Sequence, residues 1–175
     1  SVASRGLGDV YKRQTQHIGA EGSEQYFIGG GVKRQILDNY SVTSFGITLE
    51  NSAPTPITAF SYLPWGDPIA SNRSLFLNST TKNYGIYVGG IYYEIDGATF
   101  SDINFAKWFT MSTGSMSNDG LSKVNSNTVL HPWLQDADGK YWLITSEGKT
   151  SVTAGETVID NPPTVTPELL TAITS

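Results

Sequence analysis

The stretch that decides the fold is Tyr84-Gly-Ile-Tyr-Val-Gly-Gly-Ile-Tyr-Tyr-Glu-Ile95. Two β-rich runs flank a Gly-Gly pair, which is typical of a β-hairpin with a two-residue turn, because glycine readily adopts the positive φ angles of such turns. This turn sets a register that pairs Val88 with Ile91 and Ile86 with Tyr93. One face of the hairpin is then wholly apolar, and the other face carries a polar and aromatic set: Tyr87, Tyr92 and Glu94.

Strand and turn signals continue on both sides of this hairpin. Residues 41–49 alternate as a strand does, and Asp96-Gly97 is expected to form the next turn, followed by a third strand that begins at Ala98. Short strands separated by Gly-containing turns predict an all-β fold, namely an antiparallel β-sandwich or partly open barrel built from meanders, with little helix. No internal repeat is evident in the sequence.

A second meander is expected over residues 129–160. Asp138-Gly139 is the expected first turn, with Leu134 opposite Leu143 and with Trp133 and Trp142 on the other face. Apolar residues on both faces indicate either strands that are covered on both sides or a face that presents aromatic rings to a ligand.

The chain is expected to have three parts. Ser4–Gln14 resembles a translated sequencing adaptor, which implies that residues 1–14 are a non-native arm attached to an N-terminally truncated fragment. Residues 15–160 are expected to form a single β domain. Residues 161–175 are expected to be a tail or linker, or a short helix that begins at Pro167.

Composition excludes several classes of function. The 175 residues contain no Cys, 19 Ser, 19 Thr and 18 Gly, and only 15% are charged, against roughly 25% in an average domain. The formal charge of −5 becomes −7 without the arm, and no Lys/Arg run is present to follow a phosphate backbone. We therefore expect no nucleic-acid partner and no membrane insertion. The missing cysteines exclude disulfides, thiolate metal sites and cysteine nucleophiles.

The sequence predicts no catalytic residues, metal or cofactor. With two His residues and no Gly-x-Ser-x-Gly motif, neither a Ser-His-Asp site nor a zinc site is indicated. Asp136-Ala-Asp138-Gly139, with Glu147 further on, resembles a calcium loop, but the β-like residues between them favour a hairpin turn. Glu94 with Asp96 or Asp102 is the one candidate carboxylate pair for glycoside hydrolysis, and a solvent-facing Glu is the preferred interpretation.

Aromatic side chains supply the candidate ligand site. Glu94 shares a face with two tyrosines, as in a sugar-binding platform, and three tryptophans add further rings. The candidate ligand-binding residues are Tyr87, Tyr92, Glu94, Trp108, Trp133 and Trp142.

Two functions fit these features. The composition resembles that of phage appendage proteins in general texture, which implies a non-enzymatic structural or receptor-binding domain of a phage virion (tail, fibre or baseplate), located in the virion or outside the cell. The expected partners are copies of the chain or other virion subunits. The alternative is a carbohydrate-binding module, or a fragment of a secreted bacterial glycan-active protein such as a glycoside hydrolase, with a surface glycan as partner. It requires at least two exposed, coplanar rings among the four tryptophans of the chain.

Overall fold

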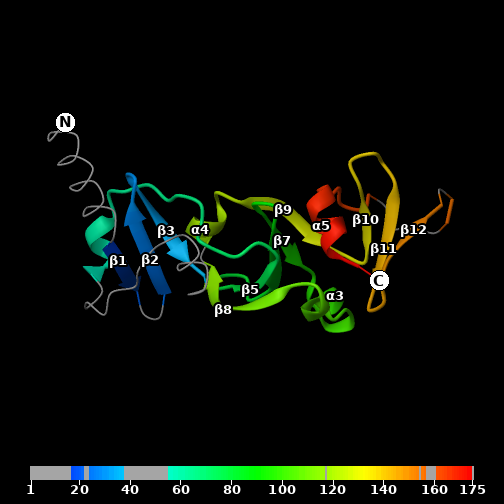
Figure 1. Cartoon of the computed structure of the whole chain (residues 1–175), viewed down its shortest axis with the longest axis horizontal. Coiled ribbons are helices and arrows are strands. Elements are labelled where there is room, and N and C mark those ends of the chain that lie inside the picture. Colours follow the sequence, from blue (N-terminus) through cyan, green and yellow to red (C-terminus); the bar gives the residue numbers. More distant parts are fainter. Residues whose placement is uncertain are drawn as a thin grey trace, which may run out of the picture. The chain divides into compact units, whose positions relative to one another are not determined.

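The computed structural model (Figure 1) describes residues 17–21, 24–37, 55–116, 118–153, 155–156 and 161–174. The chain divides into two compact units, Ser1–Ala70 and Ser71–Ser175, where the sequence predicted a single β domain over 15–160. Each unit buries its own apolar clusters, which is why each is compact by itself. The predicted arm and the predicted strand 41–49 lie outside the described residues.

The first unit contains one four-stranded sheet, in the order β3-β2-β1-β4. Its three long strands are antiparallel and β4 is parallel to β1. Tyr26 and Ile28 of β2 are buried with Ile57, and Ile36 packs with Ile69. The elements are β1 (His17–Glu21), β2 (Glu24–Gly29), β3 (Val32–Ile36), β4 (Thr55–Pro56) and the 3₁₀ helix η1 (Ile57–Phe60).

The second unit begins with a five-stranded sheet, in the order β8-β5-β6-β7-β9. The predicted hairpin is confirmed: Val88 pairs with Ile91 and Ile86 with Tyr93, and the two turn glycines have φ of 59° and 77°. The outer strands β8 and β9 run parallel to their neighbours. The strands are β5 (Ser74–Asn78), β6 (Tyr84–Val88), β7 (Ile91–Ile95), β8 (Thr110–Met116) and β9 (Asn125–Leu130).

The third strand that was predicted to begin at Ala98 is instead a helix, α3 (Gly97–Asp102). The Asp96 carboxylate accepts a hydrogen bond from the backbone N–H of Thr99 at 3.2 Å, so the Asp-Gly pair caps a helix and does not form a hairpin turn. Two further short helices follow: η2 (Phe105–Lys107) and α4 (Asn118–Leu121).

The last sheet has the order β10-β11-β12 and is antiparallel. Leu134 lies opposite Trp142, and not opposite Leu143 as predicted. The Asp136 carboxylate accepts hydrogen bonds from the N–H groups of Asp138 and Lys140, which lengthens the loop to three residues and shifts the register by one. The strands are β10 (Trp133–Gln135), β11 (Tyr141–Thr145) and β12 (Gly148–Val152).

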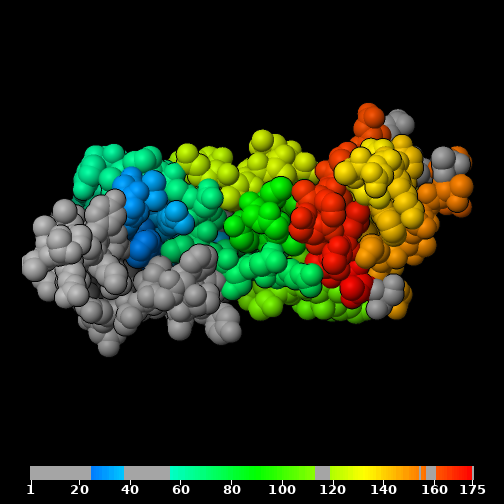
Figure 2. Space-filling model, turned by 45° about the horizontal axis from the view of Figure 1, so that its top comes forward, coloured from blue at the N-terminus to red at the C-terminus, as the bar shows by residue number. Residues whose placement is uncertain are grey.

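The segment 161–175, predicted as a tail or linker or as a short helix from Pro167, contains the short helix α5 (Pro167–Ala172). Leu169 and Ile173 are fully buried and belong to the largest apolar cluster among the described residues, together with Ile86 of β6 and Leu134 of β10. Figure 2 shows α5 (red) beside the strands of this unit. The helix therefore completes the core that the two sheets of the second unit share.

The structure contains an internal repeat that the sequence did not reveal. Three hairpin turns begin at Gly30, Gly89 and Ser146, so the repeats are spaced by 59 and 57 residues. In each repeat three consecutive strands form an antiparallel meander, a later residue or strand pairs in parallel with the first strand, and a short helix follows. The all-β class is thus confirmed, with open, mixed sheets built on a tandem repeat.

Candidate functional site

The central hairpin is formed by β6 and β7. Its face that was predicted to bind a ligand is largely part of the protein interior. Tyr92 is 0% exposed. Its ring stacks on Phe76 at 4.9 Å between centroids and lies directly over Gly85, where a Cβ atom would come within 2.1 Å of the ring. A ligand cannot reach this ring without unfolding of the sheet.

The hydroxyl group of Tyr92 is buried and has no hydrogen-bond partner among the described residues. Burial raises the pKa of Tyr92 far above its ordinary value, and the charge of Glu94 acts in the same direction. Burial of this hydroxyl therefore favours the neutral phenol.

Glu94 holds a loop in place. Its carboxylate accepts hydrogen bonds from Asn83 Nδ2 at 2.7 Å and from Thr81 Oγ1 at 3.3 Å. Its proposed acid partner Asp96 caps α3, and Asp102 is exposed at the end of that helix. These bonds assign structural roles to Glu94 and Asp96. Tyr87, the remaining member of the predicted set on this hairpin, is half-buried.

All four tryptophans are half-buried. Trp108 Nε1 donates to the carbonyl oxygen of Thr174 at 2.8 Å, and Trp142 Nε1 donates to the Asp136 carboxylate at 3.0 Å. Trp65 lies against Tyr26 in the first unit, and Trp133 is on the face of its sheet opposite Trp142. Trp108 thus ties the C-terminal segment to the fold, and Trp142 ties the loop of Asp136 to it.

The carboxylate of Asp136 organises the loop that resembled a calcium site. The hydrogen bond from the Trp142 indole, followed by that from the Lys140 backbone, lowers the pKa of Asp136 below its ordinary value. Because the carboxylate already accepts these bonds, the loop is a hairpin turn, as the sequence favoured. Among the described residues no three His, Asp or Glu side chains are placed to hold a metal ion.

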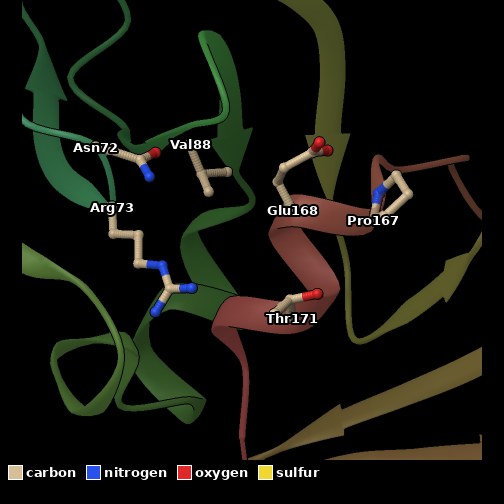
Figure 3. Close-up of a pocket in the computed structure, with 6 residues that line it drawn as sticks. All are labelled: Asn72, Arg73, Val88, Pro167, Glu168 and Thr171. Carbon is tan, nitrogen blue, oxygen red and sulfur yellow. The ribbon is translucent and has the colours of Figure 1, made fainter.

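A small pocket of about 210 Å³ opens between the end of the central hairpin and α5 (Figure 3). Asn72 and Arg73 lie on one wall, and Glu168 and Thr171 of α5 lie on the other. The Asn72 side chain accepts a hydrogen bond from the Gly89 N–H at 2.9 Å, so it is held by the turn. With one cation and one anion the pocket can accept a small polar group, but it lacks a carboxylate pair or a nucleophile beside a base.

The sequence did not predict this pocket. Asn72 and Glu168 are far apart in the chain, and only the docking of α5 on the sheet brings them together. No local pattern of residue types marks such a site.

In the part of the chain that the structure describes, no helix is long and apolar enough to span a membrane.

No known family matches the chain, and no curated protein does. Among solved structures, a chain of the periplasmic assembly from the ESX-5 inner membrane complex is 12% identical, with a TM-score of 0.25 over 90% of this chain. A chain of the intact ESX-5 inner membrane complex is 10% identical, with a TM-score of 0.26 over 99% of this chain. The present chain spans 58% and 55% of those two chains. TM-scores this low do not indicate a shared fold or a shared function.

Proposed function

We propose that the chain is a non-enzymatic structural or binding module of an extracellular assembly, and that a phage virion is the assembly that its composition favours. The observation that supports this proposal most strongly is the tandem repeat, together with the structural use of the candidate residues. Glu94, Asp96 and Asp136 are engaged in hydrogen bonds that hold loops and a helix, and Tyr92 is enclosed. Repeated β units of this kind extend a surface on which partners assemble.

The carbohydrate-binding alternative receives less support. It needs flat, exposed aromatic rings, whereas the four tryptophans are half-buried and two of their indole nitrogens bond within the protein. A glycan array on the full chain separates the two functions. Specific glycan binding that Trp133→Ala abolishes would favour the alternative.

The solution mass of the full chain tests the virion proposal, because virion subunits act as oligomers. We expect light scattering at tens of micromolar to give a mass at least twice the 19.0 kDa of one chain. A single monomeric species over that concentration range would count against a virion subunit.

A further inference from the structure

The third repeat leaves uncovered a sheet edge that the other two repeats cover. In the first repeat β3 pairs in parallel with the later segment 65–69. In the second repeat β7 pairs in parallel with β9. β12 has the same place in the third repeat, and within the described ranges no strand lies on its outer side; in Figure 1 it is the last strand of its sheet.

The direction of the backbone groups along β12 follows from the neighbouring strands. Ile144 of β11 donates its N–H to the Pro132 carbonyl at 2.7 Å, on the β10 side. Adjacent residues of a strand point these groups in opposite directions, so Leu143 faces β12 and bonds with its partner Thr150. The residues on either side of Thr150 therefore direct their N–H and C=O groups to the open side of the sheet: Lys149 and Ser151.

The equivalent residues of the other repeats use these groups. Lys33 of β3 donates its N–H to the Pro64 carbonyl at 3.0 Å and accepts from Gly66 N–H at 2.9 Å. Tyr92 of β7 donates its N–H to the Val124 carbonyl at 2.8 Å. The hydrogen-bond pattern that a parallel strand would complete on β12 is thus already present twice in this chain.

The side chains beside this edge also differ between the first two repeats and the third. In the first repeat Ile36 packs with Ile69 and with Phe27 of β2. In the second repeat Ile95 lies opposite Leu130 and in one cluster with Ile86. In both trios the third member comes from the parallel segment.

In the third repeat the trio is incomplete. Val152 is equivalent to Ile36 and Ile95, and Leu143 is equivalent to Phe27 and Ile86. No described residue occupies the position that Ile69 and Leu130 have in the other two repeats. The side chains of Val152 and Leu143 are half-buried, whereas Ile36 is 7% and Ile95 0% exposed. An aliphatic side chain at this place would cover them.

We propose that the outer edge of β12 binds an extended segment of a partner polypeptide, which runs parallel to β12 and places one aliphatic side chain against Leu143 and Val152. Addition of a strand to a sheet edge derives its affinity from backbone hydrogen bonds and its specificity from such alternate side chains. The Nζ atom of Lys149 bonds to carbonyls of Leu170 and Ile173 on the core face, so this cation is turned away from the face that carries Leu143 and Val152. This binding surface goes beyond the proposed function, since it does not depend on which assembly contains the chain.

A peptide titration of the full chain tests this surface. The probe is a capped peptide with the sequence of residues 123–131, Lys-Val-Asn-Ser-Asn-Thr-Val-Leu-His, which contains the strand that covers β7. We expect it to shift the backbone amide NMR signals of Lys149 and Ser151 and to slow their hydrogen exchange. A control peptide with Leu130→Asp should bind at least tenfold more weakly, because a carboxylate would replace the aliphatic contact.

Two variants of the full chain locate the binding. Ser151→Pro removes an outward N–H and leaves the bonds to β11, because Pro is tolerated at a sheet edge; Val152→Asp keeps the backbone and places a charge at the contact. Both should lose the peptide while retaining the Trp108 indole signal of the folded core. Absence of binding at millimolar peptide, equal binding of the control peptide, or unchanged binding to a folded Val152→Asp variant would overturn the proposal.

Discussion

Substitution of Gly85 by Ala tests whether the aromatic face of the central hairpin is part of the interior. A Cβ atom at this position would lie 2.1 and 2.2 Å from two ring carbons of Tyr92 and 2.3 Å from its hydroxyl oxygen. The ring cannot move aside easily, because it is fully buried and stacked on Phe76. Overpacking of a dense core costs about 1–3 kcal/mol, and we expect Gly85→Ala to lie at the upper end, near 3 kcal/mol.

Urea unfolding of the full chain, followed by circular dichroism, gives this free energy if the slope with denaturant is unchanged. In a Tyr92→Val background the clash is absent, so Gly85→Ala should cost less than about 0.5 kcal/mol, a strong non-additivity between the two sites. The matched control is Gly97→Ala at the start of α3, where no atom lies within 4 Å of the added Cβ; it should not destabilise the protein. A Gly85→Ala variant as stable as the parent chain would refute the interpretation that the ring is buried. So would a Gly85→Ala substitution that costs as much in the Tyr92→Val variant as in the parent chain.

Four further outcomes are expected. Tyr92→Phe should raise the free energy of unfolding by about 1 kcal/mol, because it removes a buried hydroxyl without a described partner; a loss in the same urea titration would reveal a hidden partner. Leu169→Ala should cost about 2–5 kcal/mol, since this fully buried side chain belongs to the main core; a change below 1 kcal/mol would show that α5 is a dispensable tail. Because hydrogen bonds lower the pKa of Asp136, they stabilise the loop at pH values above the ordinary pKa range of Asp, and this stabilisation is lost as the pH falls through the lowered pKa. The NMR signal of the Trp142 indole should move in that acid range, and this step should be absent in Asp136→Asn. Deletion of residues 1–14 should change stability by no more than about 0.5 kcal/mol, and unfolding of the shortened chain would contradict the adaptor interpretation.

The sequence was most informative where a two-residue turn set the geometry by itself. The Gly-Gly pair gave both the existence and the register of the hairpin between β6 and β7, because these turns depend on local backbone conformation. Asp-Gly pairs were ambiguous. The pair at Asp96 caps α3 and the pair at Asp138 lies in a longer loop, since the position of a capping carboxylate decides between these outcomes.

The candidate site was predicted less well because burial depends on distant segments. Alternation assigned Tyr92 to a second face correctly, but it could not show that Phe76 and Gly85 enclose that face. The repeat was hidden for a similar reason. The third turn replaces Gly-Gly by Ser146-Glu147, so the shared strand order is visible only once the parallel pairings are known.

Hydrogen exchange at equivalent amides of the three repeats tests the repeat architecture most directly. The N–H groups of Lys33 and Tyr92 bond to carbonyls of the parallel segments, whereas the equivalent N–H of Lys149 points to the open edge of β12. We predict slow exchange at Lys33 and Tyr92 and fast exchange at Lys149 in the isolated full chain. Exchange at Lys149 as slow as at Tyr92 would contradict the open edge, and fast exchange at all three would contradict the repeat.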